Sequence, residues 1–89
     1  MKRITYNVAL DSVISVVSGF QKIKIYDREN EYDKEPKLLF NGLTKDFGSI
    51  HTKLPYGYSE YKVSRSMVWR IDVEEEYLVF TLQTKYEQY

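Results

Sequence analysis

The alternation of apolar residues between Met67 and Thr84 constrains the fold of this chain more than any other feature. Every second position is apolar on both sides of three consecutive glutamates: Met67, Trp69, Ile71 and Val73 before them, Leu78, Phe80 and Leu82 after them. Side chains two residues apart lie on the same face of a strand, and β-branched and aromatic residues favour strands. Two such runs joined by a short polar link predict a C-terminal β-hairpin.

The N-terminal segment has the spacing of a helix instead. Its apolar residues follow one another at intervals of three and four, as one helical face requires: Tyr6, Leu10, Val13 and Val17. Thr5 suits the N-cap of this helix, and Gly19 suits the residue after its end. The β-branched residues within 13–17 lower helix propensity and would suit a strand. We therefore expect a helix over residues 5–18, with a strand as the alternative.

Two shorter strands are predicted in the middle of the chain. Ile23 and Ile25 alternate with polar residues in a strand that ends at Asp27, and residues 38–40 form a second strand. Asn41-Gly42 is the dipeptide most typical of a tight hairpin turn. The residues after it make a poor return strand, so the alternative is that this dipeptide only ends the strand.

The segment 44–60 and the C-terminal tail show no regular pattern. Tyr61 and Val63 either begin a further strand or lead into the hairpin. The tail of residues 85–89 is expected to fray. The role of the long segment 44–62 stays open.

Together these elements predict a single α+β domain over residues 1–89, with one N-terminal helix packed on an antiparallel sheet of four to five strands that ends in a C-terminal hairpin. Several strands are apolar on both sides, since Leu39 opposes Leu38 and Phe40. One helix covers only one face of a sheet, so apolar surface stays open on the other, and such patches commonly mark association. We expect a homodimer.

Three short runs of residues occur in a recognisable order. They comprise Ile23, Ile25, Tyr26 and Asp27, then Leu38, Leu39, Phe40 and Gly42, and finally Leu78 to Leu82. Placed after an amphipathic helix, they resemble a loose group of short hypothetical proteins from phages and mobile elements of Gram-positive bacteria. That group has no assigned activity, so the resemblance implies only an intracellular accessory protein.

Composition and charge exclude several classes of protein. The absence of cysteine excludes a disulfide scaffold, a thiolate zinc site and a cysteine nucleophile. Thirteen basic and thirteen acidic residues leave no net charge, whereas nucleic-acid binders usually carry a basic excess. No apolar run approaches the ~18 to 20 residues of a membrane span, and no signal-peptide cleavage site follows the N-terminal apolar stretch. We expect a cytoplasmic protein without membrane contact.

Acidic residues gather in two places. The loop 27–35 has acids at alternate positions, as a calcium-binding EF-hand loop does. Tyr32 stands where that loop needs glycine, and Leu38 stands where it needs glutamate. The glutamates 74–76 are explained as a charged hairpin tip that discourages edge pairing. We expect solvated connections at both places, and no metal or cofactor.

A catalytic site has little support in this sequence. Ser49, His51 and Asp46 could be combined on paper as a triad, yet no nucleophile elbow accompanies them, and triads are recognised by geometry. A single histidine cannot build a multi-histidine metal site. The four glycines lie far apart, so no phosphate-binding loop is present. We expect no enzymatic activity.

The segment 53–65 is the most function-like part of the chain. It interleaves tyrosines with cations: Lys53, Tyr56, Tyr58, Tyr61, Lys62 and Arg65. Aromatic rings stack on unpaired bases while cations hold phosphates, so this pattern suits a single-stranded nucleic-acid binder. Glu60 interrupts the basic pattern, and no RNP-like signature appears. The alternative is a loop that packs its tyrosines on the sheet or against a second subunit.

Binding is therefore the function that we expect from the sequence. The first prediction is a non-enzymatic protein-interaction or regulatory module that uses its open sheet face or the segment 53–65. The second is a weak single-stranded nucleic-acid binder that uses the tyrosines and cations of that segment, and the third is a small enzyme without a recognisable motif. The sequence names neither the partner nor the biological process.

Overall fold

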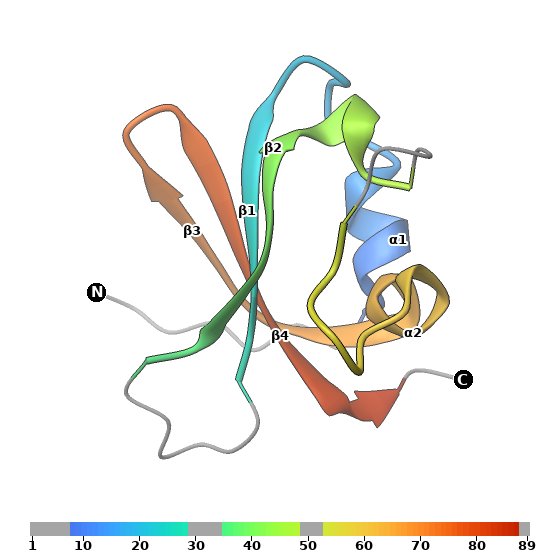
Figure 1. Cartoon of the computed structure of the whole chain (residues 1–89). Coiled ribbons are helices and arrows are strands. Elements are labelled where there is room, and N and C mark those ends of the chain that lie inside the picture. Colours follow the sequence, from blue (N-terminus) through green and yellow to red (C-terminus); the bar gives the residue numbers. More distant parts are fainter. Residues whose placement is uncertain (1–7, 29–34, 49–52, 88–89) are drawn as a thin grey trace.

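The computed structural model describes residues 8–28, 35–48 and 53–87, with the backbone alone for residues 85–87. These residues form an α+β domain with two short α-helices, one 3-10 helix and four strands (Figure 1). In chain order the elements are α1 (Leu10–Ile14), β1 (Lys22–Asp27), β2 (Lys37–Leu43), η1 (Thr44–Asp46), α2 (Glu60–Arg65), β3 (Ser66–Glu74) and β4 (Tyr77–Glu87). The α+β class is confirmed, with two α-helices where the sequence predicted one.

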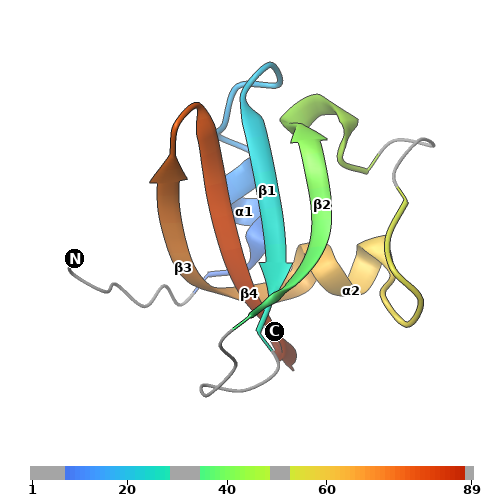
Figure 2. The same cartoon turned by 60° about the vertical axis from the view of Figure 1, so that its left-hand side comes forward.

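The four strands form one mixed sheet in the order β2-β1-β4-β3. The pairs β1/β2 and β3/β4 are antiparallel, whereas β1 and β4 run parallel. The prediction of a purely antiparallel sheet is therefore wrong. Strand β3 follows α2 and starts at the same end of the sheet as β2 (Figure 2). Consequently β4 runs beside β1 in the same direction, as a long crossover permits.

The predicted C-terminal hairpin is confirmed. Strands β3 and β4 pair from their shared tip, where Glu74 faces Tyr77 across a two-residue link. Glu75 in that link has a φ of 55°, a left-handed conformation that non-glycine residues adopt at a cost. Strand β4 continues to Glu87, so part of the tail that was expected to fray is paired strand.

A bulge in β3 breaks the predicted alternation. The register shifts between Val68 and Arg70, so that Val68 faces Leu82 and Ile71 faces Phe80. Because directly opposed residues share a face, Val68 and Ile71 both lie on the helix side although they are three positions apart. Strict alternation predicts that Val68 and Ile71 lie on opposite faces. That prediction is wrong, and the extra residue of the bulge is the physical reason.

The N-terminal helix is much shorter than predicted. Helix α1 covers Leu10–Ile14, and single turns continue it as far as Val17. Its N-cap is Ala9, which also bridges to Met67 of β3, while the predicted cap Thr5 lies outside the described residues. The choice of helix over strand is correct. The β-branched run explains the early end, because such residues restrict helix propagation.

The second helix, α2, lies where a strand was one of the predictions. Ser59 caps it, because its side-chain oxygen accepts a hydrogen bond from the Lys62 amide at 3.1 Å. Val63 is completely buried and inserts into the core. A further strand at Tyr61 and Val63 is therefore wrong: the serine cap and the burial of one helical face favour a helix.

Helices α1 and α2 pack on one face of the sheet, and no helix of the described residues covers the other face (Figures 1 and 2). The core between helices and sheet combines residues from α1, α2 and all four strands: Leu10, Ile23, Ile25, Leu39, Val63, Val68, Phe80 and Leu82. The uncovered face presents polar and aromatic side chains, including Lys24 and Tyr77, which lie 4.5 Å apart from ammonium to ring centroid. Val79 on this face is nonetheless buried.

Asn41 and Gly42 do not form a turn. Both lie inside β2, opposite Lys24 and Ile23 of β1. A Cβ at Gly42 would stand 3.3 Å from Cζ of Phe40, so the missing side chain leaves room for that ring. The glycine thus serves packing within a strand, and the prediction of a tight hairpin turn here is wrong.

Candidate binding groove

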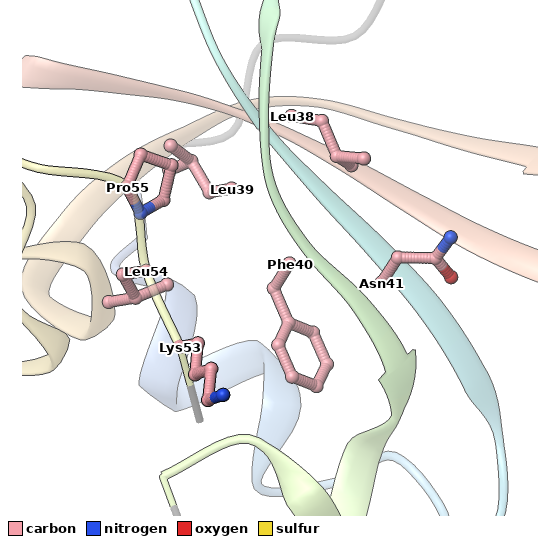
Figure 3. A pocket seen from close by; sticks show the side chains of 7 residues that line it. All are labelled: Leu38, Leu39, Phe40, Asn41, Lys53, Leu54 and Pro55. Carbon is pink, nitrogen blue, oxygen red and sulfur yellow. The ribbon is translucent and has the colours of Figure 1, made fainter. Parts of the chain in front are cut away.

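A groove runs beside β2, on the outer edge of the sheet. Its volume is about 470 Å³, and it is lined by Leu38, Leu39, Phe40 and Asn41 from β2 and by Lys53, Leu54 and Pro55 from the segment before α2. Figure 3 shows Leu54 and Pro55 across the hollow from Leu39 and Phe40. Most of these residues are apolar, which is typical of a surface that binds an uncharged part of a ligand.

A bulge in β2 explains why two successive apolar side chains reach this groove. Phe40 faces Ile25 and Leu38 faces Tyr26, with the extra residue Leu39 between them. Leu39 is buried on the helix side and Phe40 packs against the same core, so both point to one face. The Phe40 ring is held edge-on against Phe47, with ring centroids 5.3 Å apart.

The opposite wall is fixed by a buried carboxylate. Asp27 is 1% exposed and accepts hydrogen bonds from the Tyr58 hydroxyl at 2.5 Å, the Thr84 amide at 3.1 Å and the Thr84 hydroxyl at 2.8 Å. Tyr58 thereby ties the segment 53–59 to the ends of β1 and β4. A carboxylate with three donors is well satisfied despite its burial.

Sequence reasoning missed Asp27, which it placed in a solvated loop. The signal was available: Asp27 follows Ile23 and Ile25 at the same interval of two, and all three are buried on the core face. The next residue, Arg28, is also buried, and its guanidinium carbon lies 4.0 Å from the centre of the Trp69 ring. Residues 29–34 of the predicted calcium-like loop lie outside the described residues.

The outer edge of β2 has main-chain groups without a partner strand. The Thr44 amide donates to the Gln21 carbonyl at 2.9 Å, which makes this a hydrogen-bonded pair. Bonded and non-bonded pairs alternate along an antiparallel ladder. The register therefore bonds Gly42 to β1 and directs the main-chain groups of Asn41 and Leu43 outward. No residue that the structure describes bonds to those outward groups.

The six residues proposed from the sequence do not form one surface. Lys53 lines the groove, while Tyr58 turns its hydroxyl inward to Asp27. Tyr56 is fully exposed at a turn, and Tyr61 is exposed on α2 with the Arg65 guanidinium carbon 5.1 Å from its ring centroid. Lys62 is half-buried and lies in the first turn of α2. The structure thus separates the tyrosines that the sequence grouped together.

The other residues considered from the sequence are also dispersed. Asp46 is exposed in η1, and Ser49 and His51 lie outside the described residues. Glu76 at the hairpin tip pairs with Lys22, and its carbonyl accepts a hydrogen bond from Nε2 of Gln21 at 2.7 Å. This carboxylate raises the pKa of Lys22, first through the hydrogen bond and then through its charge.

A second hollow, of about 410 Å³, lies on the face without helices. Tyr26, Val79 and Thr81 line it together with the ion pair of Arg70 and Asp72, whose Nε and Oδ2 are 2.7 Å apart. Glu35 and Glu74 also line this hollow, so its walls are more charged than those of the apolar groove beside β2.

No helix among the described residues is long and apolar enough to cross a membrane. Residues 8–28, 35–48 and 53–87 also contain no group of three or more His, Asp or Glu side chains placed to hold a metal ion.

Comparison with known proteins gives no relative: no family model matches the chain, and no curated protein or solved structure matches it either. The resemblance to short phage and mobile-element proteins therefore stays a prediction.

Proposed function

We propose that this chain is a non-enzymatic binding module that receives a short extended segment of a partner protein along the outer edge of β2. The observation that carries the proposal is the combination of outward main-chain groups at Asn41 and Leu43 with an apolar groove beside them. An added strand gains affinity from main-chain hydrogen bonds and specificity from alternate side chains that enter pockets.

The bulge at Leu39 favours a short partner segment over a long one. A bulge interrupts the regular ladder, so the incoming chain can pair with the stretch after it for only a few residues. The side chains of that incoming segment on the groove side would meet Leu39, Phe40 and Leu54. The groove therefore supplies the apolar contact that a short strand pairing needs.

A second copy of the chain suits this edge less well. Lys37 at the start of β2 and Lys53 in the groove are both cationic, so two copies brought together at this edge repel each other. The homodimer expected from the sequence stays a prediction. Light scattering tests it: a dimer that the Asn41→Pro substitution converts to monomers would put a second copy, instead of a partner peptide, on the edge.

Single-stranded nucleic acid is the second candidate, and the described geometry favours it less. Stacking needs free aromatic faces close to cations. Tyr58 is turned inward, and the Arg65 guanidinium already lies over one face of the exposed Tyr61 ring. Salt-sensitive binding of labelled single strands that fails after Tyr56→Ala would favour this function over peptide binding.

The proposed function is tested by selecting random octapeptides displayed on phage against the immobilised protein. The matched control is Asn41→Pro, which removes an outward N–H and leaves the bonds of Gly42 to β1 in place. We expect sequences to be enriched on the original protein and not on the control, whose fold is checked by circular dichroism. No enrichment, or equal enrichment on both proteins, would overturn the proposal.

A further inference from the structure

From the charges around the groove we infer that the segment bound at β2 is acidic at both ends and apolar between them. The inference rests on the proposed function and adds the chemistry of the partner. It follows from the positions of two lysines at the groove, from the apolar wall between them, and from the geometry of an extended chain.

One lysine belongs to the groove itself. Among the described residues that line it, Lys53 alone is charged, and it is exposed. Figure 3 shows Lys53 at the end of the groove near Phe40. An anionic side chain of the bound segment at this end is therefore attracted, whereas a cationic one is repelled.

The other lysine stands at the opposite end. Lys37 begins β2 and is exposed, and its ammonium lies 5.4 Å from the centre of the Tyr58 ring. Tyr58 follows Pro55 on the far wall and is anchored to Asp27. The Lys37 ammonium therefore stays near the groove on the same side of the sheet as Lys53.

The bulge at Leu39 shortens the stretch of β2 between Lys37 and the end near Lys53. Lys37 faces Asp27 and Asn41 faces Lys24, so the two are three positions apart in the register, which is about 10 Å of extended chain. The groove thus fits an apolar side chain that lies against Leu39 and Leu54, with acidic residues before and after it in the bound segment.

The first arm of the test uses the peptides selected on phage. We expect the enriched sequences to share an apolar residue with acidic residues before and after it. Enrichment of apolar sequences without the acidic residues would overturn this inference and leave the proposed function standing. Failure to enrich any sequence would overturn the proposed function, and the inference with it.

The second arm measures affinity by fluorescence anisotropy with one enriched peptide and with a copy in which its acidic residues are replaced by their amides. Lys37→Gln and Lys53→Gln should each lower the affinity for the acidic peptide by about threefold and leave the affinity for the amide peptide unchanged. Lys24→Gln is the matched control, because Lys24 lies on the face without helices, over Tyr77. Equal binding of both peptides, or equal loss with Lys24→Gln, would contradict the inference.

Discussion

The two edges of the sheet are built differently, although each is an outer strand with a bulge. At β3, the N-terminal segment closes the edge: Ala9 bridges to Met67, and the Val68 amide donates to the Val8 carbonyl at 2.9 Å. At β2, the main-chain groups of Asn41 and Leu43 meet no described residue, and an apolar groove lies alongside.

The difference shows how one small sheet protects one edge and exposes the other. Unpaired strand edges invite association, and proteins usually cover, charge or distort them. Strand β3 is covered at its start and carries charged residues such as Arg70 and Asp72 further on. Strand β2 has only a bulge at Leu39 and the charge of Lys37 to discourage pairing. These two features limit nonspecific strand pairing and still admit a short complementary segment.

Proline substitution tests the difference most strongly. Val68→Pro removes the amide bonded to Val8 and a fully buried side chain, and we expect a loss of at least about 2 kcal/mol in the free energy of unfolding. Asn41→Pro removes an outward amide and should change that free energy by less than about 0.5 kcal/mol. Urea denaturation measures both, and equal losses would contradict the assignment of open and closed edges.

The wall opposite β2 depends on Tyr58. Tyr58→Phe removes a hydrogen bond to the buried Asp27 carboxylate, and we expect it to cost about 1 to 2 kcal/mol in the free energy of unfolding. It should also weaken peptide binding, because the segment 53–59 loses its anchor. Tyr56→Phe is the control, since that side chain is fully exposed. Thermal denaturation and anisotropy measure the two effects, and identical behaviour of the two variants would refute this role for Tyr58.

Substitution of Gly42 tests the shape of the groove and should change the free energy of unfolding less than Val68→Pro and Tyr58→Phe do. In Gly42→Ala the new Cβ stands 3.3 Å from Cζ of Phe40, and that ring can shift because it borders the groove. We expect a change of less than about 1 kcal/mol in the free energy of unfolding, together with weaker peptide binding. Unchanged affinity for the selected peptides would mean that the Phe40 ring does not shape the bound state.

The hairpin tip should give the smallest effect, because Lys22 and Glu76 are exposed. Glu76 raises the pKa of Lys22 above the ordinary value of 10.5, so folding favours the protonated amine. The stabilisation is fully present below pH 10.5 and is lost as the pH rises through the folded pKa. Glu76→Gln should therefore narrow the stability difference between pH 9 and pH 12. A drop in stability that is the same with and without Glu76 would contradict the pairing.

The local parts of the fold could be predicted from the sequence. The hairpin follows from period-two alternation on both sides of the glutamates, and the burial of Ile23 and Ile25 follows from the same rule. These patterns depend on neighbours only a few residues away. The parallel pairing of β1 and β4 could not be predicted, because it depends on the end of the sheet at which β3 begins, and β3 is distant in sequence from β2.

The candidate site was predictable only in part. The segment 53–65 was singled out, and Lys53 does line the groove, yet its tyrosines point in different directions. Their directions depend on partners distant in sequence, such as Asp27 for Tyr58. The prediction of a turn at Asn41-Gly42 failed because the dipeptide lies inside β2. There the missing side chain of Gly42 leaves space for the Phe40 ring.

Amide hydrogen exchange followed by NMR tests the central claim most directly. Without a ligand, the amides of Asn41 and Leu43 should exchange much faster than those of Gly42 and Val68, which are bonded inside the fold. On addition of a selected peptide, the amides of Asn41 and Leu43 should become protected. The account would be contradicted if the peptide left the amides of Asn41 and Leu43 unprotected, or if these two amides were already protected in the free protein.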